Sequence, residues 1–274
     1  MNHASNRWKK YSSFFRLRFA MGLQYRTAAF AGIMTQFAWG FLEIMVFHAF
    51  HSTNPEAFPM QFEQLASYIW LQQAFLALFM TWFMENEIFD SIMDGNICYE
   101  LCRPINIYDI WFARSVANRT SRALLRCLPI LTVSFLLPEP YTMTLPPDWL
   151  TLLCFLLSML LGLTVTVAIC MIIYMLSFFT VSPQGLKIIF ALSVELFQGK
   201  VIPLPFFPTR LKIIMELLPF ASMENVPFRI YSGHIQGAEA LKFVMIQIFW
   251  IIVLTIAGKL LCRSAMKKVT VQGG

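Results

Sequence analysis

The sequence predicts an all-α membrane protein with six transmembrane helices, and three observations lead to this fold class. Hydrophobic residues make up 58% of the 274 residues and charged residues only 13%, whereas a soluble domain carries roughly 25% charged residues. The apolar residues form long runs, and a helix needs about 20 of them to cross a bilayer core of ~30 Å. Lys and Arg collect at the ends of these runs, as the positive-inside rule describes. We therefore expect one transmembrane domain over residues 1–274, without a sizeable soluble part.

Residues 1–27 predict an interfacial helix on the cytoplasmic leaflet. This stretch contains six basic residues, six aromatic residues and no acidic residue. A cleavable signal peptide would have its apolar core here, so we do not expect one. Basic side chains meet lipid phosphates while aromatic rings lie at the acyl boundary, and this composition is therefore typical of a helix that lies on the membrane.

Six apolar runs predict the transmembrane spans. We expect them at about residues 28–50, 65–84, 116–137, 149–180, 186–201 and 243–261. The fourth run has 32 residues; as a helix it would measure ~48 Å, so it must tilt strongly or project beyond the bilayer. On the third span, Arg119, Arg122 and Arg126 recur at spacings of three and four. They predict one basic stripe that can snorkel towards the interface.

The segment 202–240, between the last two spans, predicts an outer re-entrant region. It is apolar but is broken by Pro203, Pro205, Pro208 and Pro219. The unbroken piece, 209–218, is too short to cross a membrane. Such a segment is tolerated at membrane depth only if it packs on protein.

Six spans place both termini on one side of the membrane. The predicted inner segments hold 16 of the 21 basic residues, and the outer segments hold five: Lys200, Arg210, Lys212, Arg229 and Lys242. The positive-inside rule therefore predicts that both termini of this multi-pass protein are cytoplasmic. We expect Lys200, Arg210 and Arg229 near the outer region to be hydrated and screened within ~8 Å at physiological salt.

Residues 85–104 predict a short amphipathic element in the cytoplasm, between the second and third spans. Its first part has four apolar residues that share one face of a helix: Ile88, Phe89, Ile92 and Met93. This spacing is typical of a short amphipathic helix. Gly95 and Asn96 can stop that helix because both tolerate left-handed backbone geometry. A second segment, 98–103, ends against Pro104. We interpret the element as the part that transmits work from a soluble partner to the membrane.

The charge of this element bears on what it contacts. From Glu85 to Ile110 there are six acidic residues and one basic residue, Arg103. An anionic leaflet repels such a segment, whereas a basic groove on another protein attracts it. Periodicity alone leaves a second interpretation open, in which the element only fills the lipid interface.

The sequence contains no motif expected of an enzyme. It has no GxxxxGK[ST] for nucleotide phosphates, no HExxH and no GxSxG. His48 and His51 have only Glu56 as a nearby carboxylate, and interfacial positions explain them better than a metal does. Cys98 and Cys102 lack a second pair for zinc, and we expect all six cysteines to be free thiols. We expect no catalytic, cofactor or metal site in this chain, and no nucleic-acid partner.

Two carboxyl groups within predicted spans are candidates for a substrate path. Glu43 and Glu195 lie in the first and fifth apolar runs, where each costs roughly 2.5–3.5 kcal/mol at mid-bilayer. Residues placed in this way usually face the bundle interior or a water-filled path. Gln36, Gln72 and Gln73 could bond to them across helices. The structural alternative, a protonated or hydrogen-bonded carboxyl that only packs, stays open.

Residues from both halves of the chain carry a resemblance to a known family. They are the basic aromatic N-terminus ending in Tyr25-Arg26, EIFDSIMDGNICYELCRPINIYDI after the second span, and FQGKVIPLPFFP, LLPF and VPFRIYSG near the end. With six spans, these features resemble the permease subunit of an ABC type-2 transporter. The subgroup most similar is the bacterial set with paired permeases, linked to export of drugs or other organic cations. One departure is that Gly199 is followed by Lys200 and Val201 before the prolines.

The resemblance implies roles for the two unusual segments. Residues 85–104 would be a coupling helix that docks on a separate ATPase subunit, and 202–240 would be an outer re-entrant lid. We assign the docking contacts to Ile88, Ile92, Met93, Gly95, Leu101, Arg103 and Pro104. Permeases of this kind act as homodimers or heterodimers with two ATPase subunits, so ATP and Mg²⁺ would be bound by the partner and no cofactor by this chain.

The implied function is ATP-driven export of a small organic substrate across the cytoplasmic membrane. In a dimer, two copies of Glu43 and Glu195 would bring up to four carboxyl groups towards one cavity, which favours a cationic, drug-like substrate. The alternative is a proton-coupled secondary transporter or a channel, driven through Glu43 or Glu195 without an ATPase. A membrane scaffold without transport is the third hypothesis. An ATPase that co-purifies with the chain would distinguish the first from the other two.

Overall fold

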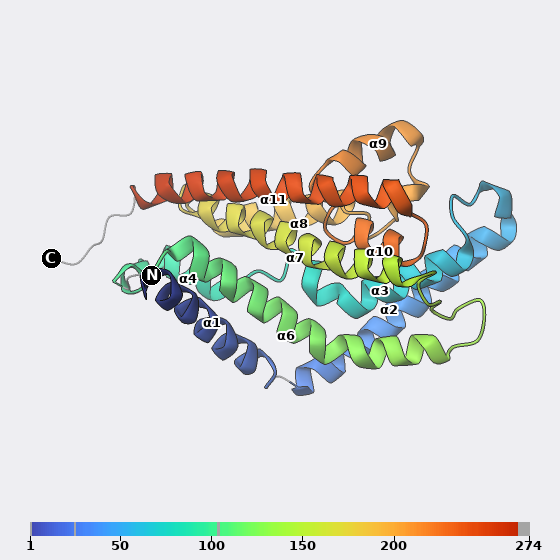
Figure 1. The fold of residues 1–274 in the computed structure, drawn as a ribbon, viewed down its shortest axis with the longest axis horizontal. Coiled ribbons are helices and arrows are strands. Elements are labelled where there is room, and N and C mark those ends of the chain that lie inside the picture. The colour runs from blue at the N-terminus through green and yellow to red at the C-terminus, as the bar shows by residue number, and fades with distance from the viewer. Residues whose placement is uncertain (1, 25, 103–104, 268–274) are drawn as a thin grey trace.

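The computed structural model describes residues 2–24, 26–102 and 105–267, and within these residues the chain is all-helical. Figure 1 shows the helices as an elongated bundle in which most of the long helices run roughly along the same axis. The α-helices in the described residues are α1 (Asn2–Gly22), α2 (Arg26–Thr53), α3 (Phe62–Phe79), α4 (Asn86–Met93), α5 (Ile97–Leu101), α6 (Ile107–Leu136), α7 (Trp149–Ser177), α8 (Pro183–Phe197), α9 (Thr209–Leu217), α10 (Asn225–Tyr231) and α11 (Gly237–Met266). Two short 3₁₀ helices cover Pro55–Ala57 and Leu204–Phe206. The all-α class predicted from the sequence is confirmed.

Three of these helices are long and apolar enough to cross a membrane. They are Ala29–Thr53 within α2, Trp149–Ser177 and Gly237–Met266. The other predicted spans correspond to helices that are shorter or more polar, so the arrangement of six spans stays a prediction. The start of α1 and the end of α11 lie at the same end of the bundle as α4 (Figure 1).

Helix α7 forms the centre of the fold. It packs against α11, α10 and α6, and most of its inward residues are small or aliphatic. Gly162 allows a close approach to this helix, because a Cβ atom at this position would lie 2.2 Å from the Met223 carbonyl oxygen. The chain that leads into α10 therefore lies directly against the α7 backbone.

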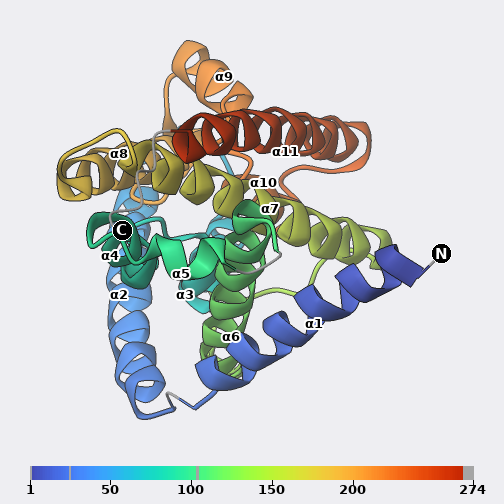
Figure 2. The same cartoon turned by 90° about the vertical axis from the view of Figure 1, so that its left-hand side faces the viewer.

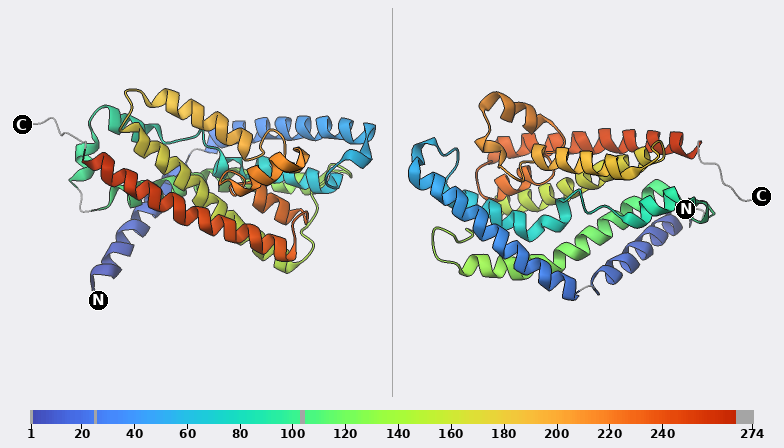
Figure 3. Two further views of the ribbon diagram at one scale, coloured as in Figure 1. Left: turned by 90° about the horizontal axis from the view of Figure 1, so that it is seen from above. Right: turned by 180° about the vertical axis from the view of Figure 1, so that it is seen from behind.

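Helix α1 leaves the bundle at an angle and contacts it mainly through α6 (Figures 2 and 3). This position fits the interfacial helix predicted for residues 1–27. The last residues of that prediction include Tyr25, which lies outside the described residues.

Helix α3 ends five residues before the predicted end of the second span. Residues 80–85 are not helical, and the reason lies in a buried arginine. Arg119 donates to the carbonyl oxygens of Leu78 at 2.9 Å and Met80 at 2.7 Å. A helix leaves its last carbonyl groups without partners, and the guanidinium group supplies them here.

The predicted stripe of Arg119, Arg122 and Arg126 is wrong for its first member. Arg119 is buried and also donates to Cys170 Sγ at 3.2 Å. It lies between α3 and α7 and does not reach the interface. Arg122 lies over the Phe83 ring, 4.4 Å from the ring centre, and Arg126 lies against Gly32 of α2.

The predicted re-entrant region consists of short helices with opposite environments. Every residue of α10 is buried, and this helix packs against α7 and α3. Helix α9 instead stands out from the side of the bundle (Figures 1 and 2), with Leu211, Ile213, Ile214 and Leu217 exposed.

Candidate functional site

Helices α4 and α5 form the element predicted at residues 85–104, and the amphipathic pattern is confirmed. Ile88 and Phe89 are buried, whereas Met93 is 47% exposed. The Phe89 ring packs on the Tyr174 ring of α7, with 5.1 Å between the ring centres. Lys187 Nζ of α8 lies over the Phe89 ring, 5.4 Å from its centre. One face of α4 is therefore fastened to the bundle.

The predicted stop between the two short helices is also present. Helix α4 ends at Met93, and Gly95 adopts a positive φ of 73°. A side chain at this position would be strained in that conformation. Arg103 and Pro104, which were predicted to complete the element, lie outside the described residues.

The docking residues predicted from the sequence divide into two groups. Ile88 is only 1% exposed, so it anchors α4 to the core and is not available to a partner. Met93 and Leu101 are exposed, and so is Tyr99, which the sequence analysis did not include. Ile92 is half-buried, and Gly95 is exposed at the turn.

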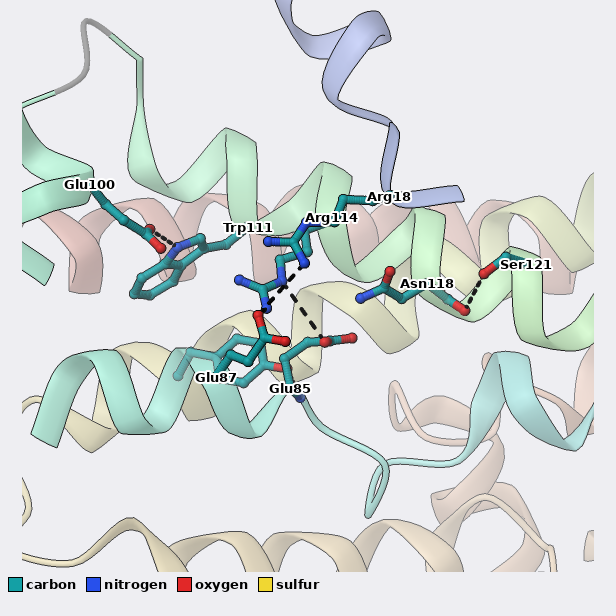
Figure 4. A network of polar contacts seen from close by, with 9 residues as sticks. Arg18, Glu85, Glu87, Glu100, Trp111, Arg114, Asn118 and Ser121 are labelled. Atoms are coloured by element: carbon teal, nitrogen blue, oxygen red, sulfur yellow. Dashed lines mark hydrogen bonds and ion pairs between the residues drawn. The ribbon is translucent and has the colours of Figure 1, made fainter. Parts of the chain in front are cut away.

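A network of charged groups ties the same element to α1 and α6 (Figure 4). Arg114 of α6, which is 5% exposed, forms ion pairs with Glu87 and, at 3.9 Å, with Glu85. Arg18 of α1 lies 3.6 Å from the same Glu87 carboxylate. The Trp111 indole N–H donates to Glu100 at 2.5 Å. These three carboxylates are therefore already paired within the chain.

Glu85 connects the element to α7 as well. Its backbone N–H donates to the Tyr174 hydroxyl oxygen at 2.8 Å. Together with a hydrogen bond of 2.7 Å from Lys187 of α8 to Asn86, this contact joins the start of α4 to two further helices. A displacement of α4 would be passed to α1, α6, α7 and α8 at once.

The predicted substrate-path residues, Glu43 and Glu195, both line one cavity of about 1160 Å³. Its walls are formed by α2, α3, residues 80–83, the end of α8 and residues 200–206. Aromatic and aliphatic side chains make up most of the surface. A cavity of this size is large enough for a drug-sized molecule, since pockets for such ligands measure roughly 300–1,000 Å³.

Glu43 occupies the part of α2 that faces α3. Its Oε2 atom accepts a hydrogen bond from Gln73 Nε2 at 3.4 Å. Gly40, one turn earlier, brings the two helices together, because a Cβ atom there would lie 2.8 Å from the Trp70 ring. The predicted contact between Glu43 and Gln73 across helices is therefore present.

Glu195 differs from Glu43 because it is paired. Its Oε1 atom lies 2.8 Å from Lys200 Nζ. The expectation that Lys200 and Arg229 are hydrated is wrong for Arg229, whereas the Lys200 side chain is 21% exposed. Lys200 neutralises Glu195, and Arg229 is 2% exposed and lies 2.5 Å from Glu216. Burial requires such partners, because a lone buried charge is very costly.

Sequence reasoning missed a third carboxyl group, Glu224, which is fully buried. Gln72 Nε2 lies 3.4 Å from Glu224 Oε1 and donates to the Lys200 carbonyl oxygen at 2.8 Å. Nearby, the Tyr68 hydroxyl donates to the Gly199 carbonyl oxygen at 3.3 Å. The sequence around Glu224 is polar and has no apolar periodicity, so no local pattern marks it as buried.

The comparison with protein families matches most of the chain. A family model described as ABC-2 family transporter protein matches residues 37–273. This range includes α4, α5 and nearly all of the cavity lining. The comparison with curated proteins gave no match.

Proposed function

The chain belongs to the ABC-2 transporter family, and from this premise we propose that it is the permease subunit of an exporter driven through α4 and α5. Members of this family lack a catalytic ATPase domain, so this chain is not an ATPase. The family implies a partner ATPase, which we propose binds the ATP and Mg²⁺. We propose a bacterial plasma-membrane complex in which two permease copies, or a permease and a paralogue, assemble with two ATPase subunits.

The observation that carries this proposal is that α4 and α5 expose apolar side chains on one side and are held by the bundle on the other. Met93, Tyr99 and Leu101 present exposed apolar surface, while Arg114 and Tyr174 hold the opposite side. Exposed apolar groups on an otherwise anchored element favour a protein–protein contact. Closure of the ATPase pair would push α4, and its lateral contacts would move the surrounding helices.

We further propose that the path for the substrate includes the cavity lined by Glu43, and that residues 202–240 cover its outer end. Six spans with both termini in the cytoplasm would place α4 and α5 on the ATPase side. Family membership favours ATP-driven transport over the proton-coupled alternative, because ABC permeases work with an ATPase.

The experiment that tests the coupling role replaces Ile92 and Met93 with Asp in the same chain. We expect the double variant to reach the membrane but to retain less than about a tenth of the co-purified ATPase, because two charges in an apolar contact are costly. The control is Val181→Asp, at a turn residue that is 94% exposed, which should leave ATPase recovery unchanged. Wild-type recovery of ATPase with the double variant would contradict the proposal.

A further inference from the structure

One end of the large cavity contains an arginine that lacks a carboxylate partner. Arg126 of α6 is half-buried and lines the cavity. Among the residues that the structure describes, no acidic side chain lies within ion-pair distance of its guanidinium group. Withdrawing a charge from water without a counter-ion is costly. The arrangement therefore favours an anion that comes from outside the chain.

A buried amide lies beside this arginine. A Cβ atom at Gly32 of α2 would lie 2.9 Å from the Arg126 Cζ atom, so this face of α2 meets the guanidinium group. Gln36 follows one turn later on the same face, about 6 Å along the helix axis. It lines the cavity and is only 3% exposed, and neither of its amide atoms has a hydrogen-bond partner in the described residues. Buried polar groups are nearly always paired, so a ligand that accepts hydrogen bonds from both side chains would complete the site.

The charges around the cavity make this end positive. Arg122 precedes Arg126 by one turn of α6 and lies over an aromatic ring of the cavity lining. The acidic residues of the lining are Glu43 and Glu195. Glu43 follows the point of α2 that faces Arg126 by eleven residues, which places it about 16 Å farther along the axis. Glu195 is already paired with Lys200 at 2.8 Å, so neither carboxyl group neutralises the arginines.

The remainder of the cavity suits an apolar chain. Its volume of about 1160 Å³ exceeds the roughly 300–1,000 Å³ of pockets for drug-sized ligands. Trp39, Leu42 and Phe50 line it, although they are 60%, 54% and 65% exposed. The cavity is therefore open along α2 on the outside of this chain. A molecule can enter it sideways from a bilayer without crossing water.

The position of the arginine along α2 fits a lipid headgroup. Gly32, which faces Arg126, lies six residues after α2 begins at Arg26, about 9 Å along the axis. Helix α1 immediately precedes this end of α2 (Figure 2). With α1 at the membrane surface, as its sequence predicts, the guanidinium group lies near the headgroup level of that leaflet. Basic pockets between transmembrane helices at this level bind anionic lipid headgroups.

We propose that an anionic phospholipid from the leaflet on which α1 lies binds in this cavity, with its phosphate on Arg126 and Gln36 and an acyl chain along α2. This inference goes beyond the proposed transport function, because it assigns a resident membrane ligand and neither a cargo nor the ATPase. The guanidinium group donates two parallel hydrogen bonds to phosphate oxygens, a geometry that suits arginine better than lysine. Gln36 Nε2 donates a further one.

The test measures lipid binding to the purified full-length chain by native mass spectrometry. The probes are phosphatidylglycerol and phosphatidylcholine with the same palmitoyl and oleoyl chains, and glycerol phosphate as a soluble headgroup without chains. We expect wild type to bind the first phosphatidylglycerol at least about tenfold more tightly than the first phosphatidylcholine, since an uncompensated charge pairs best with a net anion. Glycerol phosphate in excess should not displace it, because the acyl chain contributes most of the affinity.

Three substitutions separate the contacts. Arg126→Gln should abolish the preference for phosphatidylglycerol, whereas Arg126→Lys keeps the charge and should retain it. Gln36→Leu should weaken both lipids by roughly fivefold, because the phosphate that it contacts is common to both. The matched control is Arg263→Gln, which removes the same charge from an exposed residue of α11 that does not line the cavity. This control should bind both lipids as wild type does.

The outcomes are decisive in each direction. Equal affinity of wild type for the two lipids would overturn the inference, and this comparison needs no substitution. A preference for phosphatidylglycerol that survives Arg126→Gln, or that is lost equally in Arg263→Gln, would show that the lipid binds elsewhere. Displacement by glycerol phosphate would identify a soluble anion as the ligand in place of a lipid. None of these results depends on recovery of an ATPase, so the proposed coupling role stands or fails separately.

Discussion

Arg114 is the residue at which the contacts of the coupling element converge. Its guanidinium group is buried and pairs with Glu85 and Glu87, which begin α4. Because it belongs to α6, it joins α4 to a long helix of the bundle. In the proposed coupling, Arg114 would transmit a displacement that the exposed residues Met93 and Tyr99 receive.

We predict that Arg114→Met uncouples ATP hydrolysis from transport. The ATPase should still co-purify, but transport per ATP should fall by about tenfold, since α4 loses its link to α6. Breaking a buried ion pair costs about 3–5 kcal/mol, and here less because Glu87 is largely exposed. The measurement compares ATP hydrolysis with transport of a fluorescent organic cation in proteoliposomes. Arg18→Met, which removes only the partly exposed partner of Glu87, is the control and should be milder.

A second residue-scale prediction concerns Gly162. Gly162→Ala places a Cβ atom 2.2 Å from the Met223 carbonyl oxygen, and this backbone cannot move without displacing α10. Overpacking of this kind costs about 1–3 kcal/mol, so we expect a lower thermal unfolding midpoint in detergent. Gly185→Ala is the matched control, because no atom lies within 4 Å of its added Cβ. Equal midpoints for the two variants would show that the contact is looser than described.

At the scale of elements, the apolar runs and the short amphipathic helix were predictable. The starts and ends of α2 and α7 follow their apolar runs within a few residues, because lipid and core both select apolar side chains. Helix α4 and its stop at Gly95 were predictable because amphipathic spacing and left-handed glycine are local properties.

The remaining elements depend on contacts that sequence spacing does not contain. The end of α3 at Phe79 is set by Arg119, which is 40 residues further along the chain. Helix α10 is fully buried although it contains Asn225 and Arg229, because these two residues find partners in Tyr68 and Glu216. In the same way, the pairing of Glu195 with Lys200 decides which carboxyl remains unpaired, and the sequence alone treated Glu43 and Glu195 as equals.

At the scale of the whole molecule, the untested question is which face meets the cytoplasm. We predict that Leu145→Cys, at a residue that is 76% exposed in the loop before α7, reacts with an impermeant maleimide in intact cells. Val181→Cys, between α7 and α8, should react only after lysis. The wild-type chain is the control, because exposed Cys102 of the coupling region should also be protected until lysis. The opposite pattern would reverse the orientation proposed here.

The non-helical stretch at residues 80–85 has a mechanical consequence. A continuous helix would transmit a force along its own axis, but here α3 ends at Phe79 and α4 begins only at Asn86. If α4 and α5 couple to an ATPase pair as proposed, the force from its closure would travel sideways, through the Arg114 and Tyr174 contacts of α4, and not lengthwise into α3. Residues 80–85 themselves stay packed on the bundle, because Met80, Thr81 and Met84 are buried and Arg119 holds the Met80 carbonyl oxygen.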